Sequence, residues 1–145
     1  MTIRFLSKIE QWKDFSNLAP YPIELEGCVW QSSEHYYQYK KFEKADHDYA
    51  QKILEAQTPK EVKVLSMQNE KRSPGWDEQK VGILKSAVLK KFTSYQKLAD
   101  LLLSTGEEEL IEANPDDYFW GEGADGTGKN MMGKMLMEIR EKLRK

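Results

Sequence analysis

The sequence of 145 residues has few of the residues that disulfide and metal chemistry need. Its one cysteine, Cys28, excludes an intrachain disulfide and a multi-cysteine zinc site. Its two histidines, His35 and His47, argue against a histidine-rich metal site. We therefore expect no metal and no other cofactor.

Other absences limit the class of partner. No apolar run is long enough for a membrane-spanning helix, and the N-terminus lacks the apolar region of a signal peptide. The 22 basic and 24 acidic residues leave a net charge of −2, so no basic surface for general nucleic-acid binding is required. There is neither a repeat nor a long linker. We expect a soluble, cytoplasmic single domain over residues 1–145, with no membrane partner and an oligomeric state that the sequence leaves open.

The apolar periodicity predicts a mainly α fold, a compact multihelical domain with a small β element. Short strands are expected at 3–6, 23–25, 28–30 and 110–111, with a hairpin turn at Glu26–Gly27. Helices are expected at 33–42, at 46–56, from 59 until the break at 71–75, at 77–92, around 98–102, and at 132–143. Their expected N-caps include Ser32 or Ser33, Thr58 and Asp77, and Met67 is expected to face the core.

One group of candidate site residues lies between Trp30 and Phe42. On a helix, Glu34, Gln38 and Lys41 have the spacing i, i+4, i+7 and share one face. A carboxylate, an amide and an amine that project together can transfer protons, hold a sugar hydroxyl or form a Schiff base. The alternative is an exposed face with ordinary Glu–Lys pairing.

Aromatic and polar residues around this group have two possible roles each. The tyrosines of the same segment can form a wall beside the site, and His35 is expected to be a structural histidine. Trp76 and Trp120 are either core residues or stacking partners for a base. Asn17 lies on a loop stiffened by the prolines that follow it, and it either joins the site or forms an ordinary turn.

A second candidate region is the glycine-rich loop at 117–130, which has four glycines and leads into the last helix. Because glycine offers no side chain to pack, we expect these positions to bend the backbone unusually or to approach a ligand closely. The amides at the start of the following helix favour an anion, so the loop is predicted to bind a phosphate group. The alternative is a mobile surface loop. It is not a P-loop, since Asn130 follows Lys129 where Ser or Thr is required.

The same loop supplies carboxylates and an amide. Cleavage of a glycosidic bond builds positive charge on the sugar, which a nearby carboxylate stabilises. The candidate acids are Asp116, Asp117, Glu122 and Asp125. Asn130 is expected to cap the last helix, to hold a ligand, or both.

Taken in order, these segments resemble the NADAR (YbiA-like) family. The matching motifs are Asp14–Asn17, the spaced residues between Trp30 and Phe42, Trp76, Lys91–Phe92, Leu110–Glu112, Asp117, Trp120–Gly123, Gly126–Asn130, Gly133 and Leu136–Met137. The resemblance extends from about Phe5 to Leu143. Leu18 stands where the family usually has an aromatic residue, and Met131–Met132 replace a more polar pair. Both departures affect the expected substrate more than the expected reaction.

The resemblance implies an N-glycosidase, a hydrolase acting on the N-glycosyl bond between (phospho)ribose and a base-like amine. It implies that Glu34, Lys41 and Asp117 are catalytic, with Lys41 either attacking the sugar to form a Schiff base or binding a sugar hydroxyl. The residues expected to bind substrate are Asn17, Gln38, Trp76, Trp120, Gly121, Gly128 and Asn130.

Two substrates are compatible with the family. One is a phosphoribosylamino-pyrimidine intermediate of riboflavin biosynthesis, and the other is ADP-ribose linked to guanine in nucleic acid. The near-neutral charge favours the small-molecule nucleotide or ribosyl phosphate over ADP-ribosylated nucleic acid. Two non-catalytic alternatives stay open, an ADP-ribose-binding module and a structural partner protein.

Overall fold

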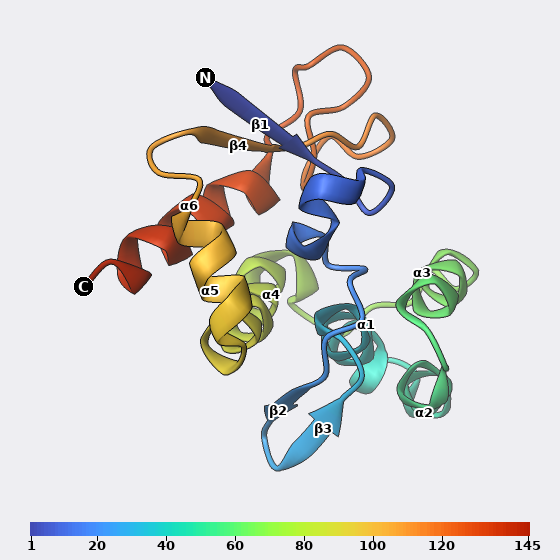
Figure 1. Cartoon of the computed structure of the whole chain (residues 1–145). Helices are drawn as coiled ribbons and strands as arrows, with labels where there is room; N and C mark the ends of the chain where they lie inside the picture. Colours follow the sequence, from blue (N-terminus) through green and yellow to red (C-terminus); the bar gives the residue numbers. More distant parts are fainter. The chain divides into compact units, whose positions relative to one another are not determined.

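The computed structural model describes all residues, 1–145, and divides them into two compact units (Figure 1). Unit 1 comprises Met1–Ser16 and Tyr95–Lys145, and unit 2 comprises Asn17–Ser94, so unit 2 is inserted in the chain of unit 1. Each unit combines helices with one two-stranded sheet. The prediction of a mainly helical fold with a small β element is confirmed. The single domain stays a prediction.

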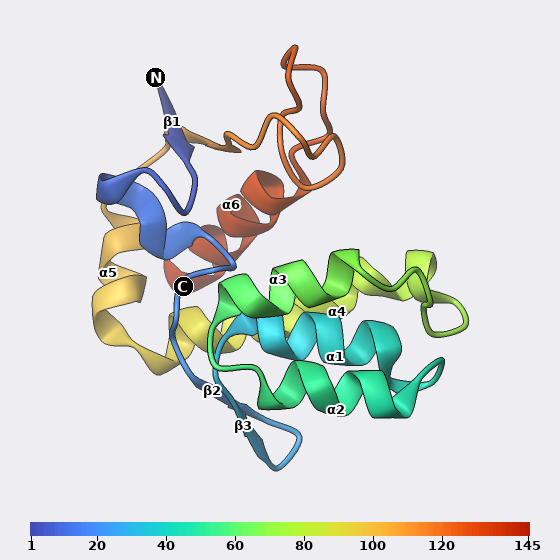
Figure 2. The same cartoon turned by 90° about the vertical axis from the view of Figure 1, so that its right-hand side faces the viewer.

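Unit 2 is built around its first helix. Its elements are β2 (Ile23–Leu25), β3 (Cys28–Trp30), α1 (Ser33–Glu43), α2 (His47–Glu55), α3 (Pro59–Met67) and α4 (Trp76–Ser94). Helix α1 contacts α2, α3 and α4, and α1, α2 and α3 lie side by side in Figure 2. Strands β2 and β3 form the antiparallel hairpin that the sequence predicts.

Two apolar clusters fill unit 2 on different faces of α1. The first joins the hairpin to α1 and α4 and consists of Ile23, Trp30, Tyr36 and Ala87. The second joins α1 to α2 and α3 and consists of Phe42, Ala50, Ile53 and Val62. Burying each large apolar side chain stabilises the fold by about 1.5–3 kcal/mol. At 100° per residue, the face of α1 that carries Glu34, Gln38 and Lys41 lies outside both clusters.

Short polar signals set the ends of these elements. Ser32, Asp46 and Thr58 each accept a hydrogen bond from the backbone amide three residues later and so begin α1, α2 and α3. An N-cap of this kind contributes about 1 kcal/mol. The hairpin turn places Glu26 at φ 54° and Gly27 at φ 77°, the conformation of a type I′ turn.

Unit 1 packs a helix against two paired strands. Its elements are β1 (Thr2–Phe5), the 3₁₀ helix η1 (Glu10–Phe15), α5 (Gln96–Leu103), β4 (Glu109–Glu112) and α6 (Met131–Leu143). Strand β1 pairs with β4 in parallel, a pairing that local sequence patterns do not reveal. Helix α6 contacts both β4 and α5. The buried Arg140 donates from Nη1 to Thr105 Oγ1 at 2.8 Å and to the Glu108 carbonyl at 2.9 Å, which fixes α6 to the segment before β4.

Two expectations about local structure are wrong. Met67 is 74% exposed and does not face the core, because at 100° per residue it lies about 140° around α3 from the buried Val62. Asp77 does not cap α4, because the helix already begins at Trp76 and Asp77 lies within the first turn.

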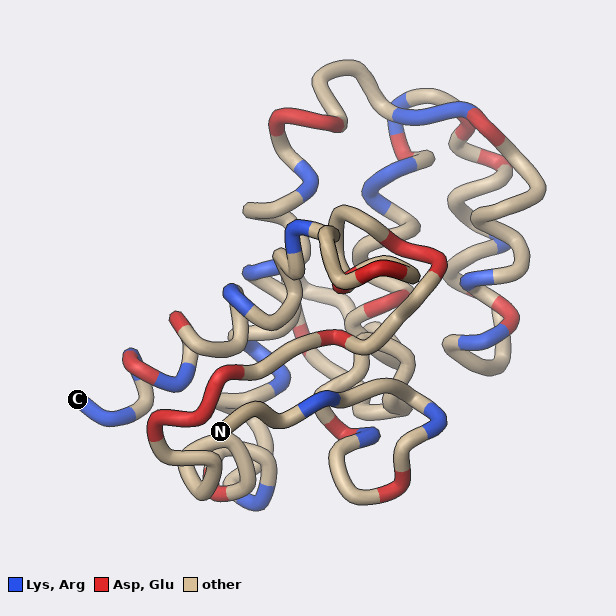
Figure 3. Tube along the Cα trace, turned by 90° about the horizontal axis from the view of Figure 1, so that it is seen from above, with Lys and Arg blue, Asp and Glu red and all other residues tan.

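No helix of the structure combines the length and the apolar character that crossing a membrane requires. Acidic and basic residues are interspersed along the trace in Figure 3.

Candidate functional site

The predicted site residues divide equally between the two units, and each group is described within its own unit. Unit 2 contains Asn17, Glu34, Gln38, Lys41 and Trp76. Unit 1 contains Asp117, Trp120, Gly121, Gly128 and Asn130.

A buried carboxylate forms the centre of the unit 2 group. Glu34 lies in the first turn of α1 and is 7% exposed. Asn17 Nδ2 donates to Glu34 Oε1 at 2.6 Å, and Gln38 Nε2 donates to Glu34 Oε2 at 3.1 Å. Ser33 Oγ donates to Asn17 Oδ1 and so fixes the orientation of the Asn17 amide. Glu34 is therefore held from the preceding loop and from the next turn of its own helix, and the exposed Glu–Lys face is ruled out.

The environment of Glu34 favours its protonated form. Burial raises the pKa of Glu34 above its usual range, although hydrogen bonds from Gln38 and Asn17 act in the opposite direction. The Gln38 amide also has a buried Oε1 without a hydrogen-bond partner. A carboxyl group with a raised pKa is suited to give up and take back a proton near neutral pH.

Lys41 lies on the same face of α1 as Glu34, as the spacing predicts. Burial, followed by the positive charge of Arg72, lowers the pKa of Lys41, and Glu34 and Lys80 act on it with smaller effects. A lysine with a lowered pKa has more of its amine in the neutral, nucleophilic form at neutral pH. The structure therefore places on one helix face a carboxyl group whose pKa is raised and an amine whose pKa is lowered.

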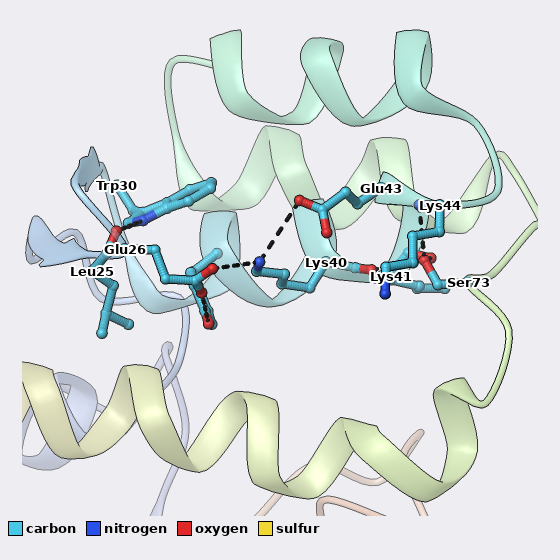
Figure 4. A network of polar contacts seen from close by, with 9 residues as sticks. Leu25, Glu26, Trp30, Lys40, Lys41, Glu43, Lys44 and Ser73 are labelled. Atoms are coloured by element: carbon cyan, nitrogen blue, oxygen red, sulfur yellow. Dashed lines mark hydrogen bonds and ion pairs between the residues drawn. The ribbon is translucent and has the colours of Figure 1, made fainter.

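Sequence reasoning missed Ser73, which holds the C-terminal end of α1. Its backbone amide donates to the Lys41 carbonyl at 2.6 Å, and its hydroxyl lies 3.0 Å from the carbonyls of Lys40 and Lys41. The same hydroxyl accepts from the Lys44 amide at 3.1 Å, as the dashed line in Figure 4 shows. These contacts fix the segment before α4 against the turn of α1 that carries Lys41. A serine between Arg72 and Pro74 gives no sequence signal for such a contact across 32 positions.

The tyrosines of α1 pack against two different tryptophans. Tyr36 and Tyr39 pack edge-on against Trp30, so the prediction of a tyrosine wall is wrong for these two. Tyr37 packs against Trp76 with ring centroids 5.1 Å apart, and Trp76 is 4% exposed.

The far side of α1 is anchored by polar contacts. Tyr36 donates to Glu26 Oε2 at 2.5 Å, and Lys40 Nζ lies 2.7 Å from Glu26 Oε1, which ties the hairpin turn to the helix (Figure 4). His35 is structural, as expected: its Nδ1 lies 2.7 Å from Ser32 Oγ and its Nε2 2.9 Å from the Ala56 carbonyl. These contacts fix α1 in place without involving Glu34, Gln38 or Lys41.

In unit 1, the glycine-rich loop is densely packed against itself. A Cβ added at Gly128 would lie 2.6 Å from the Glu122 carbonyl carbon, and one at Gly121 would lie 2.9 Å from the Asp117 carbonyl oxygen. Contacts this short exclude any side chain at both positions. At these two glycines the close approach is made to the backbone of the loop itself, and a role for Gly121 and Gly128 in binding substrate stays a prediction.

The loop amides that were predicted to bind an anion are already bonded. The backbone N–H groups of residues 128–132 donate to the carbonyls of residues 118–122 at 2.7–3.1 Å. This set includes Met131 and Met132, the first two residues of α6. An anion at these five amides would have to displace bonds that the loop already makes, and phosphate binding elsewhere on the loop stays a prediction.

The remaining polar residues of the loop have local contacts. Asp117 Oδ1 accepts from the amides of Phe119 at 2.9 Å and Trp120 at 2.8 Å, while Oδ2 makes no hydrogen bond. Trp120 is half-buried and packs edge-on against Phe119. Asn130 occupies the N-cap position of α6, but its side chain does not cap the helix: its Oδ1 accepts from the Glu112 amide and its Nδ2 donates to the Leu110 carbonyl, both at 2.9 Å.

The other acidic candidates of unit 1 are also engaged. Glu122 pairs with Arg4 at 3.3 Å, and Asp125 Oδ1 accepts from both the amide and the hydroxyl of Thr127. The Asp116 amide donates to Asn114 Oδ1 at 2.9 Å, while its carboxylate is exposed. No three carboxylate, histidine or cysteine side chains come together as a metal site would require.

Comparison with known proteins gives matches along nearly the whole chain. The N-glycosidase YbiA of Escherichia coli is 36% identical over 144 residues, covering 97% of this chain and 88% of that protein. An N-glycosidase of Nostoc punctiforme is 39% identical over 146 residues, covering 99% of this chain and 94% of that protein. A riboflavin biosynthesis protein of Vibrio vulnificus is 37% identical over 142 residues, covering 97% of this chain and 38% of that protein.

A solved structure and a family model give the same result as these relatives. The NMR structure of Escherichia coli YbiA superimposes with a TM-score of 0.88 at 35% identity, covering 99% of this chain and 84% of that one. The family model described as the NADAR domain matches residues 4–144. The chain therefore belongs to the NADAR domain family and is an N-glycosidase, a hydrolase of N-glycosyl bonds.

Proposed function

We propose that the enzyme hydrolyses the bond between the ribosyl phosphate and the amino group of a phosphoribosylamino-pyrimidine, and that Glu34 and Lys41 perform the reaction. The name of the Vibrio vulnificus relative supports riboflavin intermediates as the substrate class. The net charge of −2 supports a small metabolite over a long nucleic acid.

The observation that carries the proposal is the buried Glu34 carboxyl group held between Asn17 and Gln38. In its protonated form, Glu34 donates a proton to the leaving nitrogen while the C1′–N bond breaks and its electron pair stays on the nitrogen. The carboxylate that results then takes a proton from water as the water oxygen bonds to C1′. Glu34 ends the cycle protonated, and the products are the free amine and the sugar phosphate.

Lys41 has two possible roles in this reaction. As a neutral amine it attacks C1′ and displaces the leaving nitrogen, and the ring opens to give an imine that water hydrolyses to the sugar aldehyde and free Lys41. As a cation it binds a sugar hydroxyl and stays outside the covalent chemistry. The lowered pKa of Lys41 favours the first role.

Each unit also contributes candidate residues for binding the base or for catalysis. In unit 2, Trp76 with Tyr37 against it is the candidate contact for the base. In unit 1, Asp117 is the candidate third catalytic residue, because its Oδ1 is used by the loop and its Oδ2 is available. Trp120, on the turn that Asp117 holds, is the second candidate for the base.

Mass spectrometry with two substrates in parallel tests the proposed function. One incubation contains a phosphoribosylamino-pyrimidine and the other contains an ADP-ribosylated guanine oligonucleotide. Release of a sugar phosphate from the first alone is the expected result. Release of ADP-ribose from the second alone would assign the enzyme to the removal of ADP-ribose from nucleic acid. No product from either, together with tight nucleotide binding, would indicate a binding module and contradict the proposal.

A further inference from the structure

The proposed substrate carries a phosphate group, and the five amides at the end of the glycine-rich loop are already bonded within the loop. The N–H groups of residues 128–132 all donate to carbonyls within unit 1. A phosphate dianion in a protein is otherwise bound by cationic side chains, above all by the planar guanidinium of arginine. Cations beside Glu34 and Lys41 in unit 2 are therefore the candidate partners of the phosphate.

Three cations of unit 2 converge near the C-terminal half of α1. Arg72 Nη1 lies 3.3 Å from Asp77 Oδ1, and Lys80 Nζ lies 3.5 Å from the same oxygen. Asp77 Oδ1 is therefore shared by Arg72 and Lys80, and next to burial the charges of Arg72 and, more weakly, Lys80 lower the pKa of Lys41. These basic side chains gather locally, although the chain as a whole carries a net charge of −2.

The position of Arg72 is set by the backbone. It directly precedes Ser73, whose amide bonds to the Lys41 carbonyl at 2.6 Å and whose hydroxyl contacts the same turn. Arg72 is consequently held at the end of α1 that carries Lys41, while its side chain is 52% exposed and accessible to a ligand. Its only carboxylate contact, with Asp77 at the surface, contributes little and can exchange for a phosphate.

The neighbouring residue shows that this arrangement is specific to Arg72. Lys71 precedes Arg72 in the chain and is also exposed, but its Nζ lies 3.5 Å from Asp46 Oδ2 at the start of α2. Arg72, and not Lys71, is among the groups whose charge lowers the pKa of Lys41, after burial. The two adjacent cations thus belong to different surroundings.

We propose that Arg72, with Lys80 beside it, binds the phosphate group of a ribosyl 5′-phosphate substrate next to Lys41. The site makes the enzyme selective for phosphorylated over unphosphorylated ribosides. This inference rests on the proposed function for its substrate. It adds a phosphate-binding role for Arg72 and Lys80, and it moves the phosphate from the glycine-rich loop to the cations of unit 2.

A matched pair of substrates tests the inference. Hydrolysis of a phosphoribosylamino-pyrimidine is compared with that of the dephosphorylated riboside, using the wild type, Arg72→Ala, Arg72→Lys and Lys71→Ala. Loss of the Arg72 charge also changes the pKa of Lys41, and this affects the hydrolysis of both substrates alike. The quantity to compare between variants is therefore the ratio of kcat/KM for the phosphorylated substrate to kcat/KM for the dephosphorylated one. We expect Arg72→Ala to lower this ratio about 10- to 100-fold, chiefly through KM, with a smaller loss for Arg72→Lys. Lys71→Ala is expected to leave it unchanged.

Binding of the sugar gives a readout that does not depend on hydrolysis. By calorimetry, the wild type is expected to bind ribose 5-phosphate more tightly than ribose, and Arg72→Ala to lose this preference. An unchanged ratio and an unchanged preference in Arg72→Ala would overturn the inference, as would an equal loss in Lys71→Ala. A wild type that binds ribose 5-phosphate through Arg72 but hydrolyses neither riboside would contradict the proposed function and leave the phosphate site standing.

Discussion

Replacing Glu34 by Gln is expected to stabilise the folded protein at neutral and alkaline pH. The substitution keeps the shape of the side chain and removes its charge. In the wild type, the Glu34 carboxylate receives hydrogen bonds from Asn17 at 2.6 Å and Gln38 at 3.1 Å, yet burial still raises its pKa. The cost of burying the charge therefore exceeds the gain from its partners.

The sign of the pH dependence follows from this raised pKa. Below the ordinary glutamate value of 4.5, Glu34 is protonated in both the folded and the unfolded chain, and no charge is buried. As the pH rises through the folded-state pKa, the folded chain has to bury an ionised carboxylate and loses stability relative to Glu34→Gln. The difference in the free energy of unfolding should therefore grow with pH and reach about 1–3 kcal/mol, the cost of desolvating an incompletely compensated polar group.

The Gln38 amide makes the substitution tolerable. A glutamine at position 34 presents an NH₂ group where the carboxylate accepted a hydrogen bond, which would oppose the Gln38 Nε2 donor. Rotation of the Gln38 amide then presents its Oε1, the buried atom that lacks a partner in the wild type. One hydrogen bond is thereby exchanged for another.

The assay is urea unfolding followed by circular dichroism at several pH values between about 5 and 9, where a linear fit gives the free energy of unfolding. The exposed Glu55 on α2 provides the control substitution, Glu55→Gln, because a solvated carboxylate carries no desolvation cost. A Glu34→Gln variant that is less stable than the wild type at alkaline pH would refute the reasoning, since the hydrogen bonds would then outweigh burial.

Three further predictions follow from the contacts of the candidate site. Lys41→Arg keeps the charge but cannot form an imine. Borohydride should therefore reduce the imine to a stable covalent adduct in the wild type with substrate and give no adduct in the variant. Equal amounts of adduct by mass spectrometry would exclude Lys41 as its site. Ser73→Ala removes the hydroxyl that holds the end of α1 and should lower the free energy of unfolding by about 1–2 kcal/mol in the same urea assay, whereas an unchanged value would mean that the backbone contact alone suffices. Asp117→Asn keeps the Oδ1 atom that accepts the two hydrogen bonds of its turn, so the variant should have wild-type stability. If Oδ2 acts in catalysis, the variant should lose activity roughly 10²-fold. Full activity would mean that Asp117 only stabilises the loop.

Local signals in the sequence account for most of the fold. Ser32 and Thr58 cap helices, Glu26–Gly27 form the hairpin turn, and Glu34 and Gln38 meet across one helical turn, because each feature depends on residues within four positions of one another. These contacts follow from helix and turn geometry alone. They were predictable for that reason.

The features that the sequence did not predict depend on residues far apart. The parallel pairing of β1 with β4 joins segments more than 100 positions apart, and the contact of Ser73 with Lys41 joins two helices through a loop. Burial decides the chemistry of Glu34, and burial is a property of the whole fold. Composition also does not reveal that the amides at the end of the glycine-rich loop bond to carbonyls of the same loop.

The central claim is that the Glu34 carboxyl group performs proton transfer in the cleavage of an N-glycosyl bond. The most direct test follows sugar phosphate release from a phosphoribosylamino-pyrimidine by mass spectrometry, with the wild type and Glu34→Gln side by side. The account predicts steady release by the wild type and a rate lower by roughly 10²–10⁴ in the variant, which removes the proton donor at nearly constant shape. Release by a folded Glu34→Gln variant at the wild-type rate would contradict it.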